Sequence, residues 1–258
     1  MTDWRYPRGS RMQVLKGQRS RLGFLLAPVS ALAVITVGIV GVRQVQKFLL
    51  TARIFQVRQV LISGNQQVPG AQIVRMMNLS PGTNLFSVDL QKAGERIRGI
   101  RWIREVTLHR QLPDTLRVNV RERTPFAVVG FQSRLLVDQE GVVLEEDVPE
   151  DRYRLPVLEG VGKIRQTSDG KIEGEEFRLG LSVLAEIQGT KLVEEPFVVK
   201  LEPHNRVVLR VEGKPELRLQ APAITEQLKR LRSLQDFWRE KPGREYIDLT
   251  FANMVVVK

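Results

Sequence analysis

The sequence predicts an α+β protein with a single apolar helix near the N-terminus and two β-rich modules after it. An uncharged run of 21 residues has the length of a membrane span. The next 70 or so residues alternate in apolar character, switch twice to helical spacing and alternate again. The remainder holds many short alternating segments and two amphipathic ones, which predicts a mixed α/β sheet ending in an edge strand.

The charge of the chain is concentrated at its N-terminus. The formal net charge is +11, but residues 1–60 contain ten Lys or Arg and one acid. The rest of the chain carries 30 basic and 28 acidic residues, so it lacks the excess of cations that phosphate backbones require. We therefore expect no nucleic-acid partner, whereas the basic N-terminus fits anionic lipid headgroups.

The uncharged run, residues 22–42, reads LGFLLAPVSALAVITVGIVGV. In a helix it would extend roughly 30 Å, the hydrocarbon thickness of a bilayer. Six basic residues precede it and four lie within the twenty residues after it. The positive-inside rule thus predicts a cytoplasmic tail at 1–21, a transmembrane helix and an extracytoplasmic remainder. A cleaved signal peptide is the alternative, because Ala31-Leu32-Ala33 resembles a cleavage triplet.

The first module, residues 54–124, is expected to have the order β-α-α-β-β. IFQVRQVLISGN alternates and ends at the turn pair Gly64-Asn65. Helices are predicted from Pro69 to Met77 and from Asp89 to Arg98 because apolar residues recur there at helical spacing. IREVTLHR and TLRVNVRER then form two strands joined by a turn at Pro113-Asp114. The two helices should cover one face of the three strands.

The second module, residues 125–258, is expected to be a mixed α/β sheet. RLLVDQEGVVLEE predicts two strands, and GKIRQTSDGKIEGEE predicts an exposed loop. PFVVKLEP and RVVLRVE predict a hairpin around His204-Asn205, and PELRLQ a further strand. Amphipathic helices are predicted at 175–188 and 224–240.

The last segment, EYIDLTFANMVVVK, alternates and then ends in three valines. It predicts a strand at 245–252, a bend and a short second strand. An exposed edge strand is an aggregation hazard unless another chain pairs with it. We interpret the first strand as an edge that accepts a partner strand, with Ile247, Leu249 and Phe251 facing the core. In the alternative, this strand is central and the edge is Val255–Val257.

No catalytic or metal-binding pattern is present in the sequence. There is no cysteine, and the two histidines, His109 and His204, are isolated from one another. No nucleophile elbow or phosphate loop occurs. We therefore expect neither an enzyme nor a metal, cofactor or small-molecule substrate.

Specific residues of the first module resemble a POTRA domain. They are the segment Ile62-Ser63-Gly64-Asn65, the pairs Leu85-Phe86 and Trp102-Ile103, Leu112-Pro113-Asp114-Thr115-Leu116, Val120, and Glu122-Arg123. One such domain directly after an N-terminal anchor resembles the bacterial cell division family FtsQ/DivIB. The segment YIDLTF is similar to a strand near the end of that family's C-terminal domain.

The resemblance implies a non-enzymatic bitopic scaffold in the division complex. Its place would be the inner membrane at the septum, with the N-terminus cytoplasmic and the bulk periplasmic. It would link early and late division proteins through membrane-anchored partners of the FtsB and FtsL type. The predicted partner-binding residues are Tyr246, Ile247, Asp248, Leu249, Thr250, Phe251 and Ala252.

The alternative function is a POTRA-bearing component of a secretion or outer-membrane assembly system. That class uses repeated POTRA units or a transmembrane β-barrel. The roughly 130 residues after the first module are too few for a barrel of about 16 strands.

Overall fold

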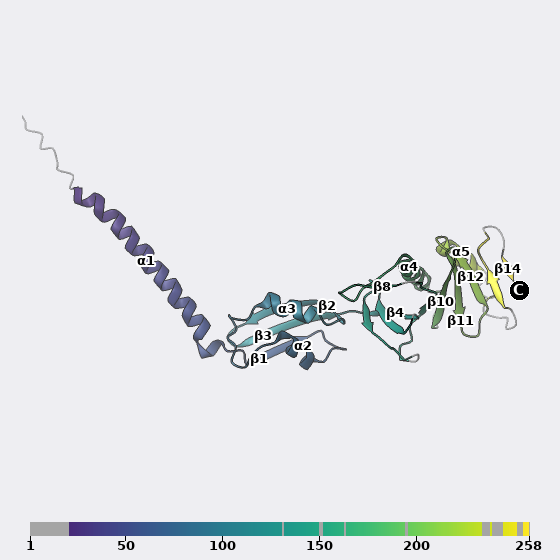
Figure 1. Ribbon diagram of the computed structural model, residues 1–258, viewed down its shortest axis with the longest axis horizontal. Coiled ribbons are helices and arrows are strands. Elements are labelled where there is room, and N and C mark those ends of the chain that lie inside the picture. Colours follow the sequence, from purple (N-terminus) through teal and green to yellow (C-terminus); the bar gives the residue numbers. More distant parts are fainter. Residues whose placement is uncertain are drawn as a thin grey trace, which may run out of the picture.

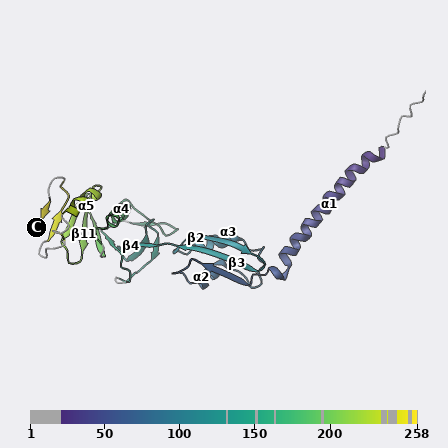
Figure 2. The same cartoon turned by 180° about the vertical axis from the view of Figure 1, so that it is seen from behind.

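The computed structural model places the parts of the chain in a row: helix α1, the first module and the second module (Figures 1 and 2). It describes residues 21–258 except 131, 150–151, 163, 194–195, 234–237, 239–244, 252–254 and 258. The side chains of 21–31, 33 and 34 are also outside the description. The predicted cytoplasmic tail therefore lies outside the described residues, apart from the backbone of residue 21.

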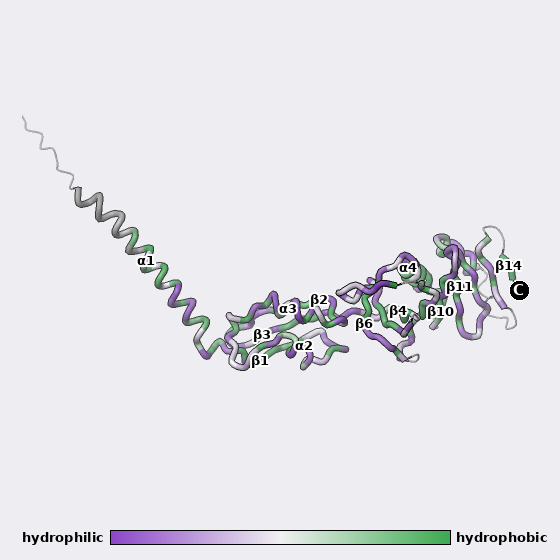
Figure 3. Tube along the Cα trace, viewed as in Figure 1, coloured by the Kyte–Doolittle hydropathy of each residue, from purple (hydrophilic) through white to green (hydrophobic). Residues whose placement is uncertain are grey.

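Helix α1 (Arg21–Thr51) includes the predicted membrane span and continues beyond it. In the described part of α1, hydrophobic residues are followed by a more hydrophilic stretch at 43–47 and by hydrophobic residues again at 48–50 (Figure 3). Within the part of the chain that the structure describes, no helix is both long enough and apolar enough to cross a membrane. The transmembrane assignment of 22–42 stays a prediction.

The first module has the predicted β-α-α-β-β order. Its elements are β1 (Gln59–Ser63), α2 (Gly70–Met77), α3 (Leu90–Arg98), β2 (Ile103–Gln111) and β3 (Thr115–Glu122). The central strand β3 runs parallel to β1 and antiparallel to β2. The apolar sides of both helices pack with the buried side of β3 in one core.

Local chemistry explains where the elements of the first module begin. The Asp89 carboxylate accepts a hydrogen bond from the Lys92 backbone N–H at 3.1 Å and so caps α3. In β3, Leu116, Val118 and Val120 are buried while the intervening side chains are exposed, as the alternation predicts. A 3-10 turn (Arg53–Phe55) connects α1 to this module.

Among the described residues of the second module, nine strands form one mixed sheet. Its order is β14-β13-β12-β11-β10-β7-β4-β5-β6. The strands are β4 (Pro125–Gly130), β5 (Arg134–Asp138), β6 (Val143–Glu145), β7 (Val157–Glu159), β10 (Phe197–Glu202), β11 (Arg206–Val211), β12 (Glu216–Gln220), β13 (Tyr246–Asp248) and β14 (Val256–Val257).

Two helices, α4 (Glu175–Thr190) and α5 (Ile224–Ser233), cover one face of this sheet (Figure 1). Their apolar sides bury Phe177, Leu184 and Leu231 with the inward side chains of the strands. The mixed sheet with two helices, after the β-α-α-β-β module, confirms the α+β class and the mixed α/β sheet of the prediction. The hairpin between β10 and β11 also turns at the predicted pair, since His204 and Asn205 both have positive φ.

Two features of the second module differ from the expectation. Strands β4 and β7 were not predicted, because near-continuous apolar runs lack the alternation of a one-sided strand. The segment predicted as a loop contains a small hairpin, β8 (Arg165–Gln166) with β9 (Ile172–Glu173), whose Ile172 is buried. Of the helix predicted at 224–240, the structure describes α5 (Ile224–Ser233) and Trp238, and the remaining residues lie outside the described residues.

Candidate functional site

The predicted edge strand is an interior strand of the sheet. Strand β13 pairs in parallel with β12 and antiparallel with β14. Ile247 is opposite Leu217 on one side and Val257 on the other. This pairing corrects the interpretation that 245–252 is the edge, because the valines fold back and add one more strand. The outermost described strand on this side is β14.

The strand is also shorter than predicted. It ends at Asp248, whose Oδ1 accepts hydrogen bonds from the Thr250 backbone N–H at 2.9 Å and from its hydroxyl at 2.6 Å. This local turn competes with strand pairing and directs the chain out of the ladder. An Asp two residues before a Thr was the sequence signal for this turn.

The side chains of the predicted site fall into three groups. Ile247 and Leu249 are fully buried, as predicted for the core-facing set. Phe251 was expected to join them, but it is 49% exposed because the chain has already left the sheet. Tyr246 is half-buried under Arg218, whose guanidinium carbon lies 3.7 Å from the ring centroid. Ala252 lies outside the described residues.

Arg230 of α5 is a site residue that the sequence did not indicate. Its Nη1 donates to the Phe251 carbonyl at 2.7 Å, and its Nη2 lies 3.5 Å from the Leu249 carbonyl. The side chain therefore holds the segment that follows β13 against the helix. The sequence showed only a basic residue off the apolar side of the helix, which is also what a solvated surface looks like.

The outer side of the sheet at β14 combines apolar side chains with backbone groups. Val255 and Val257 are half-buried against the core, and the exposed Phe251 lies on the segment that precedes them. On the side away from β13, β14 has no neighbouring strand among the described residues, and such a side offers unpaired N–H and C=O groups. We call β14 with Phe251 the outer edge.

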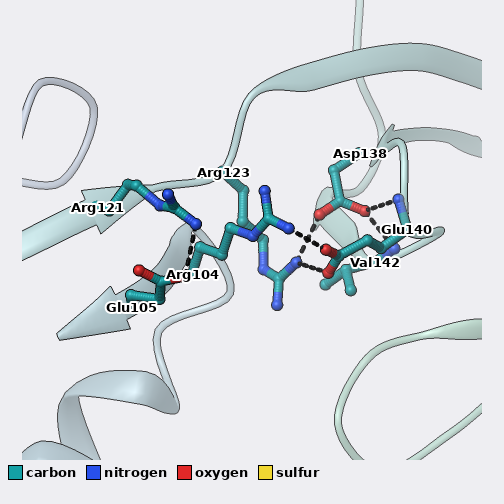
Figure 4. A network of polar contacts seen from close by, with 7 residues as sticks. All are labelled: Arg104, Glu105, Arg121, Arg123, Asp138, Glu140 and Val142. Carbon is teal, nitrogen blue, oxygen red and sulfur yellow. Dashed lines mark hydrogen bonds and ion pairs between the residues drawn. The ribbon is translucent and has the colours of Figure 1, made fainter.

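A second polar site lies where the two modules meet (Figure 4). Arg123 follows β3, and its Nη1 contacts Asp138 Oδ2 at 2.6 Å and Glu140 Oε2 at 2.8 Å. Arg104 of β2 also pairs with Glu140. The other oxygen of Asp138 accepts the backbone N–H groups of Glu140 and Val142 at 2.9 and 2.8 Å.

This network shifts the ionisation of its members. Burial alone would lower the pKa of the Arg123 guanidinium, but its hydrogen bonds to Glu140 and Asp138 outweigh burial and raise that pKa. The hydrogen bond from Arg123 lowers the pKa of the Glu140 carboxyl below its ordinary value of 4.5. Both shifts favour the charged forms, so the ion pair persists at neutral pH.

The same junction contains an apolar contact between the modules. The Arg123 backbone N–H donates to the Trp102 carbonyl at 2.8 Å. The indole of Trp102 packs against the core of the first module and against a cluster of Val128, Leu136 and Leu144 in the second. Only Arg123 and Thr124 separate β3 from β4. The junction is therefore short and partly buried, and ion pairs connect its two sides.

Several arginines of the first module have partners within the chain. Arg110 donates to the carbonyls of Leu85 and Val88, and Arg96 donates to that of Met77. Arg121 pairs with Glu105 and Arg101 with Glu146. Within the described residues, no cluster of three or more His, Asp or Glu side chains could hold a metal ion.

The β-α-α-β-β module followed by a mixed sheet defines a class of protein, and comparison with known families identifies the same class. Residues 55–123 match the family model described as POTRA domain, FtsQ-type, so the chain is a POTRA-domain protein. Residues 127–250 match the model described as cell division protein FtsQ/DivIB, C-terminal. The chain belongs to the FtsQ/DivIB family.

Individual relatives agree with the family models. The chain is 26% identical over 222 residues to the cell division protein FtsQ of Syntrophotalea carbinolica, covering 82% of this chain and 77% of that protein. It is 22% identical over 209 residues to the FtsQ of Geobacter sp. strain M21, covering 80% and 76%. The FtsQ of Rickettsia bellii is 30% identical over 105 residues, or 40% of this chain and 39% of that protein.

Family membership confirms that this is a cell division protein with a POTRA domain and that it is not an enzyme. The alternative of a secretion or outer-membrane assembly factor loses its basis. The segment after the POTRA domain matches the C-terminal domain of the division family.

Proposed function

We propose that the chain is a bitopic scaffold of the bacterial division complex. Residues 22–42 span the inner membrane, the N-terminal tail is cytoplasmic, and the POTRA and C-terminal domains act in the periplasm at the septum. The uncharged run followed by two FtsQ-type domains in order supports this arrangement. The basic residues before the run support the orientation.

The scaffold binds membrane-anchored division proteins of the FtsB and FtsL type and so links early and late components. The observation that carries this proposal is the outer edge. Strand β14 presents unpaired backbone groups on its outer side, and the exposed Phe251 lies on the segment that joins β13 to β14. A partner segment can add there as a further strand, with main-chain hydrogen bonds giving affinity and Phe251 contributing an apolar contact.

The residues predicted from the sequence then have two roles. Phe251 contributes an exposed side chain near the added strand, whereas Tyr246 stacks with Arg218 one strand further in. Ile247 and Leu249 support the added strand from the core, where they are fully buried. The partner pairs with β14 rather than with β13.

The test uses the full chain in detergent micelles and the extracytoplasmic segments of FtsB- and FtsL-type proteins. Val256→Pro and Val257→Pro are compared, because successive N–H groups of a strand point to opposite edges and one of these two points outward. Proline removes that donor, while Val→Thr at the same positions keeps it. We expect the outward-facing proline variant to lose binding without unfolding and both threonine variants to bind.

Phe251→Ala tests the side-chain part, with Leu61→Ala, an exposed apolar residue of the POTRA domain, as the control. We expect weaker binding only for Phe251→Ala. Unchanged binding in both proline variants and in Phe251→Ala would move the site away from the outer edge. Failure of the wild-type chain to bind either segment would contradict the partner assignment.

A further inference from the structure

Large apolar side chains are exposed where α1 meets the POTRA domain. Phe48 is 62% exposed, Leu50 49%, Ile54 56% and Leu112 60%. The first three are close in sequence, whereas Leu112 comes from the hairpin between β2 and β3. We call these four residues the basal patch. Clustered exposed apolar groups on a water-soluble domain mark a surface for another molecule or a membrane.

Backbone hydrogen bonds bring the two parts of the basal patch to one end of the domain. The Leu85 N–H donates to the Phe55 carbonyl at 2.7 Å, and the Val57 N–H donates to that of Thr83 at 2.9 Å. The Arg58 N–H donates to the Asp114 carbonyl at 2.9 Å. The segment after Ile54 and the hairpin tip with Leu112 are therefore joined at the end of the domain that receives α1 (Figure 1).

The end of α1 is fastened to this same surface. Phe48, Phe55 and Phe86 form two edge-to-face contacts, with ring centroids 6.4 and 5.1 Å apart. The Asn84 side-chain amide donates to the Leu49 carbonyl at 2.9 Å, and Asn84 is only 9% exposed. The helix end and the domain therefore keep one relative orientation instead of being connected by a free linker.

The charges on the α1 side of the basal patch have one sign over a long stretch of sequence, whereas the acidic Asp114 lies near Leu112 on the hairpin side. Arg43, Lys47, Arg53 and Arg58 are the charged residues between the predicted span and β1. The sequence has no acidic residue between Asp3 and Asp89. Exposed apolar side chains flanked by cations match the surface of an anionic phospholipid bilayer, in which rings and aliphatic chains enter the headgroup layer and cations pair with phosphates.

The length of α1 places the patch at the right depth. Phe48 lies six residues after Val42, the end of the predicted span, which is about 9 Å along a helix axis and less along the membrane normal if the helix tilts. The headgroup layer extends roughly 5–8 Å beyond the hydrocarbon on each side. The backbone of Phe48 thus lies at the outer boundary of this layer, and a tilt of α1 moves Phe48 and the surface fastened to it into the layer.

We propose that the basal patch rests in the headgroup layer of an anionic phospholipid bilayer and that the POTRA domain stands on the membrane at this end. The inference depends on the membrane anchor of the proposed function. The second domain then projects away from the bilayer, with the outer edge at the end of the row opposite to α1 (Figure 2).

The test uses the full chain in vesicles of three parts phosphatidylcholine to one part phosphatidylglycerol. The sequence has no cysteine, so a single introduced cysteine carries the only fluorescent label. Ile54→Cys and Leu112→Cys probe the patch, and a headgroup-bound quencher reports contact with lipid. Val74→Cys, an exposed position of α2, and Phe251→Cys, at the outer edge, are the controls.

We expect labels at 54 and 112 to be quenched and labels at 74 and 251 to stay in water. Arg53→Glu with Arg58→Glu should reduce the quenching at 54, and so should vesicles of phosphatidylcholine alone. Flotation of the vesicles shows whether the chain is anchored in them. If the chain floats with the vesicles but the labels at 54 and 112 stay unquenched, the inference is wrong and the anchor is intact. Equal quenching at 74 and 251 also overturns it, because the whole chain would then lie flat.

A chain that does not float with the vesicles contradicts the anchor itself, and the inference fails with it. Thermal unfolding of each labelled variant shows whether the domain is intact. The two failures are therefore separate observations.

Discussion

At the residue scale, the turn after β1 depends on two residues that have different physical roles. Gly64 has φ +86°, and a Cβ at that position would lie 2.0 Å from the Val120 carbonyl oxygen, so no side chain fits. Glu122 then holds the segment that follows, because its carboxylate accepts the backbone N–H groups of Gln66, Gln67 and Val68 at 2.8 to 3.1 Å.

Glu122→Ala should destabilise the POTRA domain, because it leaves these N–H groups without their acceptor. Because the Val68 donor is partly buried and the other two are exposed, the loss should cost about 1 kcal/mol, the lower end of the range for an unsatisfied buried donor. Glu122→Gln is the matched control, since its amide oxygen can still accept. Chemical denaturation measures the free energy of unfolding, and amide exchange at 66–68 locates the effect. Equal stability of the alanine variant and the wild type would contradict this role.

The Glu140 carboxyl should make the stability of the junction depend on pH. Its pKa is lowered in the folded chain by the hydrogen bond from Arg123, so folding favours the ionised form. This contribution is fully present above the ordinary value of 4.5 and is lost as the pH falls through the folded-state value. We expect Glu140→Gln to be less stable than the wild type at pH 7 and the gap to close in acid.

Urea denaturation of the wild type and Glu140→Gln at neutral and acidic pH measures this difference. Glu105→Gln is the control, because it removes a carboxylate paired with Arg121 inside the POTRA domain. A gap that stays constant with pH would show that Glu140 does not contribute through its charge.

At the element scale, the outer edge depends on helix α5. Strand β13 has only three residues, and the following segment is held by Arg230 through the carbonyls of Leu249 and Phe251. Short strands at the side of a sheet are the first to open. The contact of Arg230 with the segment after β13 should therefore set how often the outer edge opens.

Arg230→Ala should loosen β13 and β14 without unfolding the rest of the sheet. Hydrogen bonds from a charged donor contribute about 1.5–3 kcal/mol each, and the second bond is long, so the lower end applies. Amide exchange should become faster at 247–251 and at 256–257 and stay unchanged in β10 and β11. Arg230→Lys should recover part of the protection. Unchanged amide exchange in Arg230→Ala would show that Arg230 does not hold this segment in place.

At the scale of the whole molecule, the junction decides whether the outer edge has a fixed position relative to α1. The linker is two residues long, Trp102 packs into both domains, and Arg123 is paired with two carboxylates. Interfaces between domains in one chain are mobile by default, and buried aromatic contacts with paired charges counteract this. The two domains should therefore move as one body.

Trp102→Ala combined with Arg123→Ala should broaden the distance between the domains. Spin labels at Gln72→Cys in α2 and Glu212→Cys after β11 report this distance, and the absence of native cysteine makes the pair unique. We expect a narrow distribution in the wild-type background and a wide one in the double variant. Arg121→Ala, which removes a pair within the POTRA domain, should leave it narrow. A wide distribution in the wild type would contradict a rigid junction.

The sequence by itself determined the class and order of the domains and most of their elements. Alternation and turn residues identified β1, β2, β3 and the hairpin at His204-Asn205, because local backbone preferences and one buried face are enough to specify them. The same patterns placed Ile247 and Leu249 in the core. The POTRA motif and YIDLTF indicated the family.

Only the tertiary structure decided which strand is outermost, because pairing partners distant in sequence set the order of a sheet. Strand β13 became interior when β14 paired with it, and Phe251 became exposed when Asp248 ended the strand. The roles of Arg230, Arg123 and Leu112 likewise depend on groups remote in sequence. Each is a charged or apolar residue whose neighbours along the chain give no indication of what it contacts.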